Sequence, residues 1–373
     1  MPPLLIDVRA ADDPRDVVHA AAQTLAEGKL AILPTETVYG LAARALDAAA
    51  VDRLREVKGR QSGHPLTLAI RGADEARDYA PDMSPLAKRL ARRCWPGPVT
   101  LVFDDSHPES LVRRLPAPVQ HAVSPREAIG LRVPGHPLVL DTLRMVVGPL
   151  VLTSANRGGQ TEARTAQEAV RALGDDVDLV LDDGPTRYGQ PSSVVRVTGR
   201  RYEVLRVGAV PEKTLKRLAG LLILFVCTGN TCRSPMAELL CRRMLAERLG
   251  CAMPDLEDRG VQVASAGTSA VAGGGPTEEA IRVLADRGLD LRSHVTQPLT
   301  DALVRQADLI LTMTQAHRQG LVAQWPSAAD RTKVLAASGA DIADPIGGPV
   351  ERYEHCAEQI DEALRARLET MDL

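Results

Sequence analysis

The chain has 373 residues, a formal net charge of −3, 45% hydrophobic residues and 25% charged residues. This length allows two or three domains, and the composition is typical of globular proteins with an apolar core. The near-neutral charge and the aromatic content of 2% argue against a strongly electrostatic nucleic-acid binder and against a base-stacking surface.

No apolar run approaches the length of a membrane span, and the N-terminus lacks the charged-then-apolar pattern of a secretion signal. We therefore expect a cytoplasmic protein with no membrane partner. The six cysteines are expected to be reduced thiols in that compartment. Neither they nor the eight histidines follow a zinc-ligand spacing, so the sequence predicts no metal site made by the protein alone.

The first half alternates amphipathic segments with short apolar runs. The predicted helices are residues 16–27, 48–57, 85–93, 165–173 and a short helical joint over 211–220. The predicted strands are residues 29–33, 66–70, 99–103, 129–134, 151–156, 179–183, 192–197 and 202–206. The proline-rich segment 113–125 is predicted to be irregular.

Polar side chains stand at the ends of several of these strands, where ligands bind in open α/β sheets. Thr35 follows the first predicted strand, and Ser154 and Asn156 end a later one. Arg132 lies inside a short apolar strand, so it needs a carboxylate partner or an anionic ligand. The residues alone leave a structural salt bridge at Arg132 and a helix-capping role for Thr35 as alternatives.

Two cations flank a glycine in Lys58-Gly59-Arg60, directly after a predicted helix. Such a pair can bind phosphates, and it can equally complement the carbonyl groups at a helix C-terminus. The spacing does not decide between the two.

Seven short segments resemble, in order and spacing, the threonylcarbamoyl-AMP synthases, or YrdC-like family, over residues 5–210. The segments are PTETVYGL (34–41), KGR (58–60), WPGP (95–98), LRVP (131–134), SAN (154–156), SSVV (192–195) and LRVG (205–208). The resemblance implies a twisted, mixed α/β sheet domain over residues 1–210. It also implies the condensation of L-threonine, bicarbonate and ATP into threonylcarbamoyl-AMP, which serves adenosine 37 of certain tRNAs.

Further expectations follow from this resemblance. It implies Mg²⁺ with the ATP, and tRNA-modification proteins and RNA as partners. It places Thr35 at the threonine, and Arg132 and Ser192 at the threonine or carbamate end. It places at the ATP the residues Lys58, Arg60, Ser154, Asn156 and Arg206. Cations there would neutralise the departing pyrophosphate. Gln61 departs from the proline that the family usually has after Lys-x-Arg, and Ala69 from a frequent histidine.

The second half, residues 221–373, opens with an apolar strand, a tight loop and a helix. A helix N-terminus after such a loop offers unpaired N–H groups to an anion. Cys227 opens the loop and Arg233 closes it. A helix N-terminus and an arginine both stabilise a thiolate, the nucleophilic form of cysteine. The guanidinium can hold two phosphoryl oxygens, and Ser234 can donate a hydrogen bond to the sulfur.

The segment VCTGNTCRSPMAE (226–238) closely resembles the phosphate loop of the low-molecular-weight protein tyrosine phosphatase family, which includes bacterial protein arginine phosphatases. The resemblance runs from about residue 221 to the C-terminus and implies phosphorylated protein side chains as substrates, with no cofactor. It assigns the phosphate loop and its support to Thr228, Gly229, Asn230, Thr231, Cys232, Ser234, Ser265 and His294. Cys232 lies five residues from Cys227 along the loop, so the two could form a protective disulfide on oxidation, and the alternative is that Cys232 is a small packing residue.

Strands and helices alternate through this half, which predicts a parallel sheet with helices on both faces, a three-layer αβα fold. Strands are predicted over residues 221–225, 261–264 and 309–313, and helices over 236–249, 276–287, 299–307 and 351–371.

Asp344-Pro345 follows the last predicted strand at a distance from the cysteine that resembles the family's general acid. A thiolate mechanism needs such an acid to protonate the leaving group. Thr231 carries a hydroxyl where tyrosine-specific relatives have an apolar residue, and residues 346–348 provide no aromatic wall. These features favour phosphoarginine over phosphotyrosine. Arsenate reduction is disfavoured because a further cysteine pair is missing downstream.

The sequence therefore predicts a bifunctional enzyme that is both a synthase and a phosphatase. The alternative is a tyrosine phosphatase fused to a non-catalytic nucleotide- or RNA-binding module, because no residue of the first half is a nucleophile.

Overall fold

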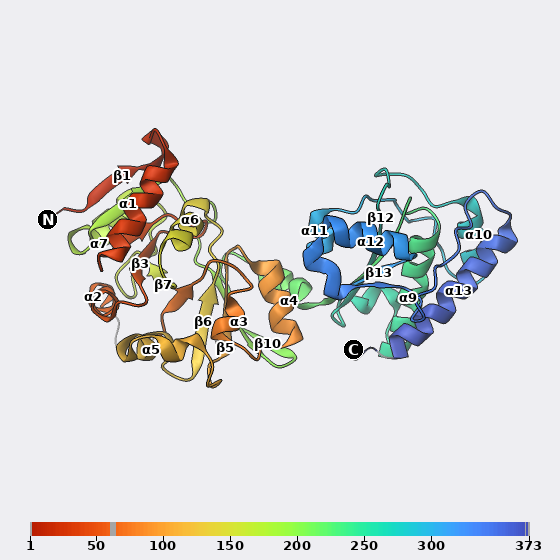
Figure 1. Ribbon diagram of the computed structural model, residues 1–373, viewed down its shortest axis with the longest axis horizontal. Helices are drawn as coiled ribbons and strands as arrows, with labels where there is room; N and C mark the ends of the chain where they lie inside the picture. The colour runs from red at the N-terminus through yellow and green to blue at the C-terminus, as the bar shows by residue number, and fades with distance from the viewer. Residues whose placement is uncertain (1, 60–64, 370, 372–373) are drawn as a thin grey trace. The chain divides into compact units, whose positions relative to one another are not determined.

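The computed structural model describes residues 2–59, 65–369 and 371 (Figure 1). Contacts divide the chain into two compact units, Met1–Leu218 and Ala219–Leu373. Within the described residues no helix combines the length and the apolar character needed to cross a bilayer. The predicted joint over 211–220 contains helix α8, Glu212–Ala219. The functional limits of the two predicted domains stay a prediction.

In the first unit, the described residues form one sheet of ten strands. Its order across the sheet is β1 (Leu4–Asp7), β8 (Leu179–Asp182), β2 (Ala31–Leu33), β3 (Gly40–Arg44), β7 (Leu150–Ser154), β4 (Thr67–Ala69), β6 (Ala128–Arg132), β5 (Val99–Asp104), β9 (Ser193–Thr198) and β10 (Arg201–Arg206). Strand β4 pairs parallel with β6 and antiparallel with β7, so the sheet is mixed, which confirms the predicted α/β class.

Helices pack around this sheet (Figure 1). They are α1 (Pro14–Ala26), α2 (Ala48–Lys58), α3 (Ala76–Tyr79), α4 (Pro85–Cys94), α5 (Ala117–Val123), α6 (Pro137–Met145) and α7 (Ala166–Leu173). One core forms where α1 and α6 meet the strands, and Val17, Leu25 and Val139 are buried there. Helix α1 begins after Asp13, whose carboxylate accepts a hydrogen bond from the Arg15 amide.

The prediction of an irregular segment at 113–125 was wrong, because α5 lies within it. Pro116 and Pro118 stand at the helix start, where a missing N–H group costs nothing. Strands β1 and β3 and helices α3 and α6 were also not predicted.

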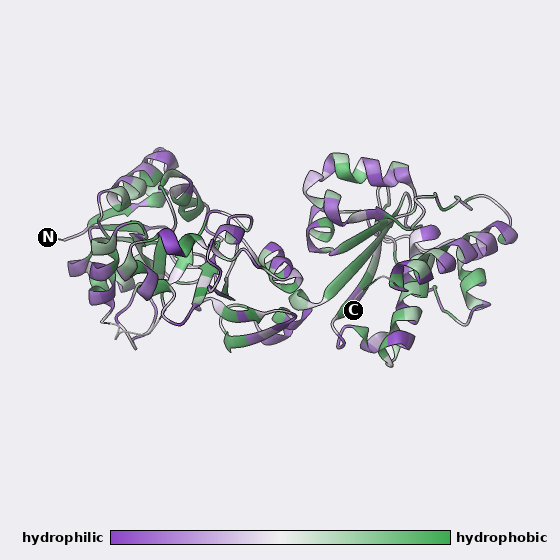
Figure 2. Ribbon diagram, turned by 60° about the horizontal axis from the view of Figure 1, so that its bottom comes forward, coloured by the Kyte–Doolittle hydropathy of each residue, from purple (hydrophilic) through white to green (hydrophobic). Residues whose placement is uncertain are grey.

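In the second unit, the described strands form a sheet in the order β12 (Val261–Gly267), β11 (Leu221–Cys227), β13 (Leu309–Thr312) and β14 (Thr332–Val334). All of these pairings are parallel. Figure 2 shows the strands as the most hydrophobic part of the unit. Alternate residues of β11 enter two cores, with Phe225 on one face and Leu224 on the other, so both faces are covered and the predicted three-layer fold is confirmed.

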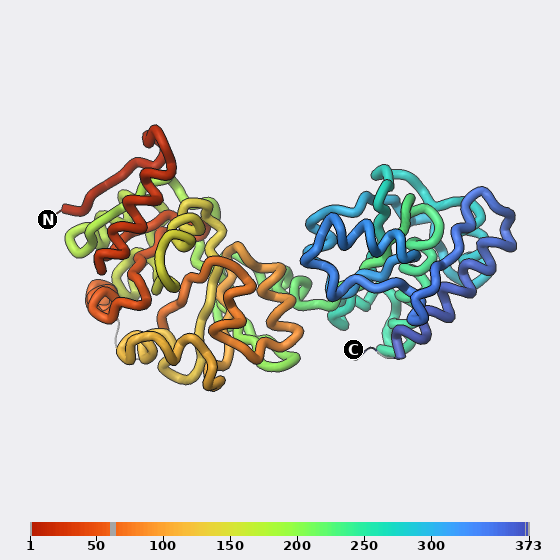
Figure 3. The backbone as a smooth tube through the Cα atoms, viewed as in Figure 1, coloured from red at the N-terminus to blue at the C-terminus, as the bar shows by residue number. Residues whose placement is uncertain are grey.

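The helices of this unit are α9 (Arg233–Leu249), α10 (Glu278–Ala285), α11 (Asp301–Gln306), α12 (Gln315–Gln324) and α13 (Val350–Glu369). Helix α13 packs along α9 on one face of the sheet (Figure 3). Helix α12 was not predicted. Its sequence is mostly polar and Leu321 is its single buried residue, so the apolar periodicity that marks an amphipathic helix is weak.

Two candidate active sites

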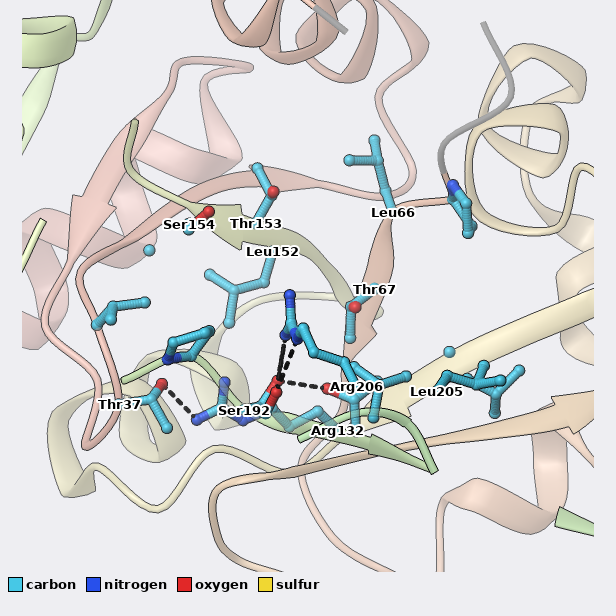
Figure 4. A pocket seen from close by; sticks show the side chains of 18 of the residues that line it. Thr37, Leu66, Thr67, Arg132, Leu152, Thr153, Ser154, Ser192, Leu205 and Arg206 are labelled. Carbon is cyan, nitrogen blue, oxygen red and sulfur yellow. Dashed lines mark hydrogen bonds between the residues drawn. The ribbon is translucent and has the colours of Figure 1, made fainter. Parts of the chain in front are cut away.

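The first unit contains a cavity of about 300 Å³ lined by residues from several strands (Figure 4). The register pairs Gly40 of β3 with Ser154 of β7, which brings the loop before β3 beside the end of β7. Of the eight synthase-site residues predicted from the sequence, five line this cavity: Thr35, Arg132, Ser154, Ser192 and Arg206. Sequence segments more than 150 residues apart therefore meet at one site.

The Thr35 side chain organises the loop before β3. Its hydroxyl donates to the Val38 carbonyl oxygen at 2.6 Å and accepts the Thr37 amide at 3.2 Å. It lies 2.8 Å from the Thr37 hydroxyl. Thr35 is only 2% exposed, so the cavity wall here is a rigid, hydrogen-bonded loop.

Arg132 has a buried carboxylate partner that sequence reasoning missed. Its Nη2 lies 2.8 Å from Glu36 Oε1 and donates to the Thr37 hydroxyl at 2.9 Å (Figure 4 shows the second contact). Both charged side chains are less than a tenth exposed. Glu36 Oε2 is buried with no hydrogen-bond partner. The structural salt bridge that the sequence left open therefore exists, and it aims Arg132 along the cavity.

Lys58 lies behind the cavity wall. Its ammonium group donates to the Ser154 carbonyl oxygen at 2.6 Å, to Asn156 Oδ1 at 2.6 Å and to the Asn156 carbonyl oxygen. Lys58 is 1% exposed and sits at the last turn of α2. It joins α2 to the end of β7, so it shapes the segment that carries Ser154. Arg60 lies outside the described residues.

Ser192 and Arg206 close the opposite wall. Arg206 Nη2 donates to the Ser192 carbonyl oxygen at 2.8 Å, and the Thr100 hydroxyl lies 2.9 Å from the Ser192 hydroxyl. A Cβ atom at Gly208 would clash with the Pro191 carbonyl oxygen, which explains the glycine that ends the LRVG segment.

In the second unit, β11 ends at Cys227 and α9 begins at Arg233. Cys227 Sγ lies 2.9 Å from the Ser234 hydroxyl and accepts the Asn230 amide at 3.3 Å. Asn230 Nδ2 also donates to the Ser234 oxygen, at 3.0 Å, so the Ser234 hydrogen is free to point at the sulfur. These donors stabilise a thiolate at the N-terminus of α9.

Asn230 holds the loop in shape. Its φ of +57° is the left-handed conformation that asparagine tolerates. Its Nδ2 donates to the Ser265 hydroxyl at 2.9 Å, and its Oδ1 accepts the Gln297 amide at 2.9 Å. His294 Nε2 donates to the Asn230 carbonyl oxygen at 3.0 Å. The structure therefore brings Ser265 and His294 to the loop, as the resemblance implied, and adds Gln297.

The Glu238 carboxylate of α9 supports Ser265. The Ser265 hydroxyl donates to Glu238 Oε2 at 2.6 Å, and Arg242 lies 2.7 Å from the other oxygen of Glu238. Glu238 was missed, although it lies one turn beyond the loop on the buried side of α9.

Arg233 and Asp344 form an ion pair beside the loop. The Arg233 side chain is 6% exposed, whereas that of Asp344 is 45% exposed. Arg233 Nη1 also donates to the Ile342 carbonyl oxygen at 3.4 Å. The carboxylate is thus the exposed member of the pair, and the guanidinium is the buried one.

Comparisons with known proteins bear on both units. Residues 23–208 match the Sua5/YciO/YrdC family, described as telomere recombination, and residues 222–372 match the low molecular weight phosphotyrosine protein phosphatase family. A putative threonylcarbamoyl-AMP synthase of Mycobacterium tuberculosis is 32% identical over 203 residues, 54% of this chain and 89% of the relative. The protein-arginine-phosphatase of Bacillus subtilis is 40% identical over 147 residues, 38% of this chain and 91% of the relative.

The chain belongs to both families. Its first half is a Sua5/YrdC-family domain and its second half a low-molecular-weight phosphatase domain, as predicted. The threonylcarbamoyl-AMP synthase of Pyrococcus abyssi is 33% identical over 54% of this chain, which spans only 57% of that relative. A structure of P. abyssi Sua5 with L-threonine shares the fold, with a TM-score of 0.52 and 23% identity over 71% of this chain and 92% of that one.

Cys232 lies inside the phosphatase loop among hydroxyl groups. Its sulfur is 3.4 Å from the Thr231 hydroxyl, 3.5 Å from that of Thr277 and 3.8 Å from that of Tyr353. Burial raises the pKa of Tyr353 to about 12, so its hydroxyl stays protonated. Cys227 and Cys232 are both free thiols in the structure.

The phosphatase half also holds a histidine that the sequence analysis did not consider. His317, at the start of α12, lies with Nε2 2.8 Å from the Thr228 hydroxyl in the phosphate loop. The sequence analysis missed His317 because it did not predict α12, the helix that places this residue beside the phosphate loop. Among the described residues of either half, no group of three or more His, Cys, Asp or Glu side chains is arranged to hold a metal ion.

Proposed function

We propose that the chain is a bifunctional enzyme: the first half forms threonylcarbamoyl-AMP and the second half hydrolyses phosphorylated protein side chains, with phosphoarginine preferred. The similarity of each half to enzymes with these activities supports the proposal. The observation that carries it is the pair of preorganised sites, each built from residues of one unit.

In the first half, the amine of L-threonine and bicarbonate condense to a carbamate with loss of water. A carbamate oxygen then attacks the α-phosphorus of ATP, and the bond to pyrophosphate breaks. Arg132 and Ser192 would hold the threonine or carbamate end, beside the Thr35 loop. The end of β7, with Ser154 and Asn156 held by Lys58, would orient the adenylate. Arg206 and Mg²⁺ would neutralise the pyrophosphate, and ATP would bring the Mg²⁺ as its complex.

The test is pyrophosphate release that requires L-threonine, bicarbonate and ATP together. A folded protein that binds ATP without releasing pyrophosphate would instead be the non-catalytic nucleotide- or RNA-binding module. We further propose that the product serves tRNA modification in the cytoplasm, with RNA or tRNA-modification proteins as partners.

In the second half, the Cys227 thiolate attacks phosphorus and the bond to the leaving group breaks. Arg233 holds two of the phosphoryl oxygens, and Asp344 gives its proton to the leaving group. Asp344 then takes a proton from water, which attacks phosphorus and breaks the S–P bond. Phosphate departs and the Ser234 hydroxyl stabilises the sulfur that leaves. No cofactor takes part.

Phosphoarginine is the preferred substrate in this proposal because the surroundings of the loop are polar and open. Thr231 offers a hydroxyl, and Gly347 and Gly348 leave no side-chain wall for a phenol ring. The test is a panel of phosphoarginine and phosphotyrosine peptides with the wild type and Cys227→Ser. Cys227→Ser should abolish both hydrolyses, and faster wild-type turnover of phosphotyrosine would reverse the preference.

A further inference from the structure

His317 bridges the phosphate loop to the N-terminus of α12. Its Nε2 lies 2.8 Å from the Thr228 hydroxyl, and its Nδ1 lies 2.8 Å from the Thr314 hydroxyl. Thr228 is exposed at the rim of the loop, directly after the nucleophile, whereas His317 is half-buried beneath it. The imidazole therefore contacts the exposed side chain that directly follows the nucleophile.

The surroundings of His317 favour its neutral form. Burial, and then the Arg233 guanidinium of α9, lower its pKa from the usual 6.5. Asp344 and Asp341, from the loop after β14, act in the opposite direction and are outweighed. A neutral imidazole has one N–H donor and one acceptor nitrogen, so its two hydroxyl partners receive different hydrogen bonds.

The helix cap suggests which nitrogen is the donor. The Thr314 oxygen already accepts the His317 amide at 3.1 Å as the cap of α12, and its remaining lone pair can accept Nδ1–H, which lies 2.8 Å away. If Nδ1–H donates there, the lone pair of Nε2 faces Thr228. The Thr228 hydroxyl must then donate inward to Nε2, and its own lone pairs face outward over the loop.

We propose that His317 turns Thr228 into a hydrogen-bond acceptor at the rim, and that this acceptor selects a phosphoguanidinium group over a phosphophenol. The leaving side of phosphoarginine carries N–H donors, whereas the ring of phosphotyrosine offers none. His317 is thus a positioning residue for substrate choice. The inference rests on the proposed phosphatase function and deepens it.

The test compares kcat/KM for a phosphoarginine and a phosphotyrosine peptide in the full chain with wild type, Thr228→Val and His317→Phe. Both substitutions are expected to lower the phosphoarginine value at least fivefold more than the phosphotyrosine value, chiefly through KM. The control is His355→Asn on α13, whose side chain is 67% exposed and away from the loop, and it should leave the ratio unchanged.

A pH series separates this role from a merely structural one. Protonation makes Nε2 a donor and turns the Thr228 hydroxyl outward, so the wild-type preference for phosphoarginine should fall as the pH is lowered from 8 to below the His317 pKa. In His317→Phe the preference should not change with pH. Nitrogen NMR of the imidazole should show Nδ1 protonated and Nε2 bare at pH 8.

The outcomes distinguish the two levels of the proposal. Equal losses on both substrates, an unchanged ratio, or a proton on Nε2 at pH 8 would overturn the role of His317 while leaving the phosphatase intact. A wild type that cleaves phosphotyrosine alone would overturn the phosphoarginine preference and this inference together. Activity that survives Cys227→Ser would overturn the phosphatase mechanism itself.

Discussion

Single buried side chains hold both sites in shape. Lys58 shows this in the first half, because an ammonium group that is 1% exposed is stable only when acceptors replace its water. The acceptors come from Ser154 and Asn156, on a segment nearly 100 residues away. The lysine therefore acts on the adenylate site through the segment that it fixes.

We expect Lys58→Met to lower ATP-, threonine- and bicarbonate-dependent pyrophosphate release at least tenfold. It should also lower the free energy of unfolding by about 2 kcal/mol, because the two oxygens of the buried Asn156 lose their ammonium donor. Urea unfolding and a pyrophosphate assay measure the two effects. The control is Lys29→Met, whose ammonium is exposed and should change neither. Normal release by Lys58→Met would contradict this role.

At the scale of the elements, the C-terminal ends of β11 and β12 form the phosphate site together. Strand β12 runs parallel to β11 and brings Gly267 beside the loop. A Cβ atom on Gly267 would lie 2.5 Å from the Thr228 carbonyl oxygen and 2.9 Å from the Asn230 amide nitrogen. The loop can approach β12 only because this residue has no side chain.

Gly267→Ala should therefore displace the phosphate loop. We expect kcat/KM of the phosphatase to fall at least tenfold and the free energy of unfolding to fall by about 1–3 kcal/mol through overpacking. Gly275→Ala is the matched control, because a Cβ atom there meets no atom within 4 Å. Peptide hydrolysis and urea unfolding of both variants test this, and equal behaviour of the two would show that the loop tolerates the methyl group.

At the scale of the whole molecule, the two sites use separate sets of residues. In the part of the chain that the structure describes, the cavity is lined by residues of Met1–Leu218, and the phosphate loop with its support lies in Ala219–Leu373. Substitutions that share no partner usually have independent effects. The two sites therefore share no residue among those that the structure describes.

A cross-comparison in the full-length protein tests this independence. Cys227→Ser should abolish peptide dephosphorylation and leave pyrophosphate release within about twofold of wild type. Lys58→Met should lower pyrophosphate release at least tenfold and leave peptide dephosphorylation within about twofold of wild type. A loss of both activities in either variant, with both units still folded by circular dichroism, would show coupling between the halves.

The sequence alone determined the two families, the α/β class and most element positions. Local chemistry carries this information: a cysteine and an arginine must frame the phosphate loop, and apolar periodicity marks strands and amphipathic helices. It also nominated Cys227, Arg233 and Asp344, whose catalytic roles remain predictions. The polar helix α12 was not predicted, because a helix without an apolar stripe shows little hydrophobic periodicity.

Only the tertiary structure decided which partners the nominated residues have. Glu36 beneath Arg132, Glu238 beneath Ser265 and His317 beneath Thr228 are buried or half-buried polar groups on other segments of the chain. Hydrogen bonds across 27 to 96 residues leave no spacing pattern in the sequence, because they depend on which segments the fold brings side by side.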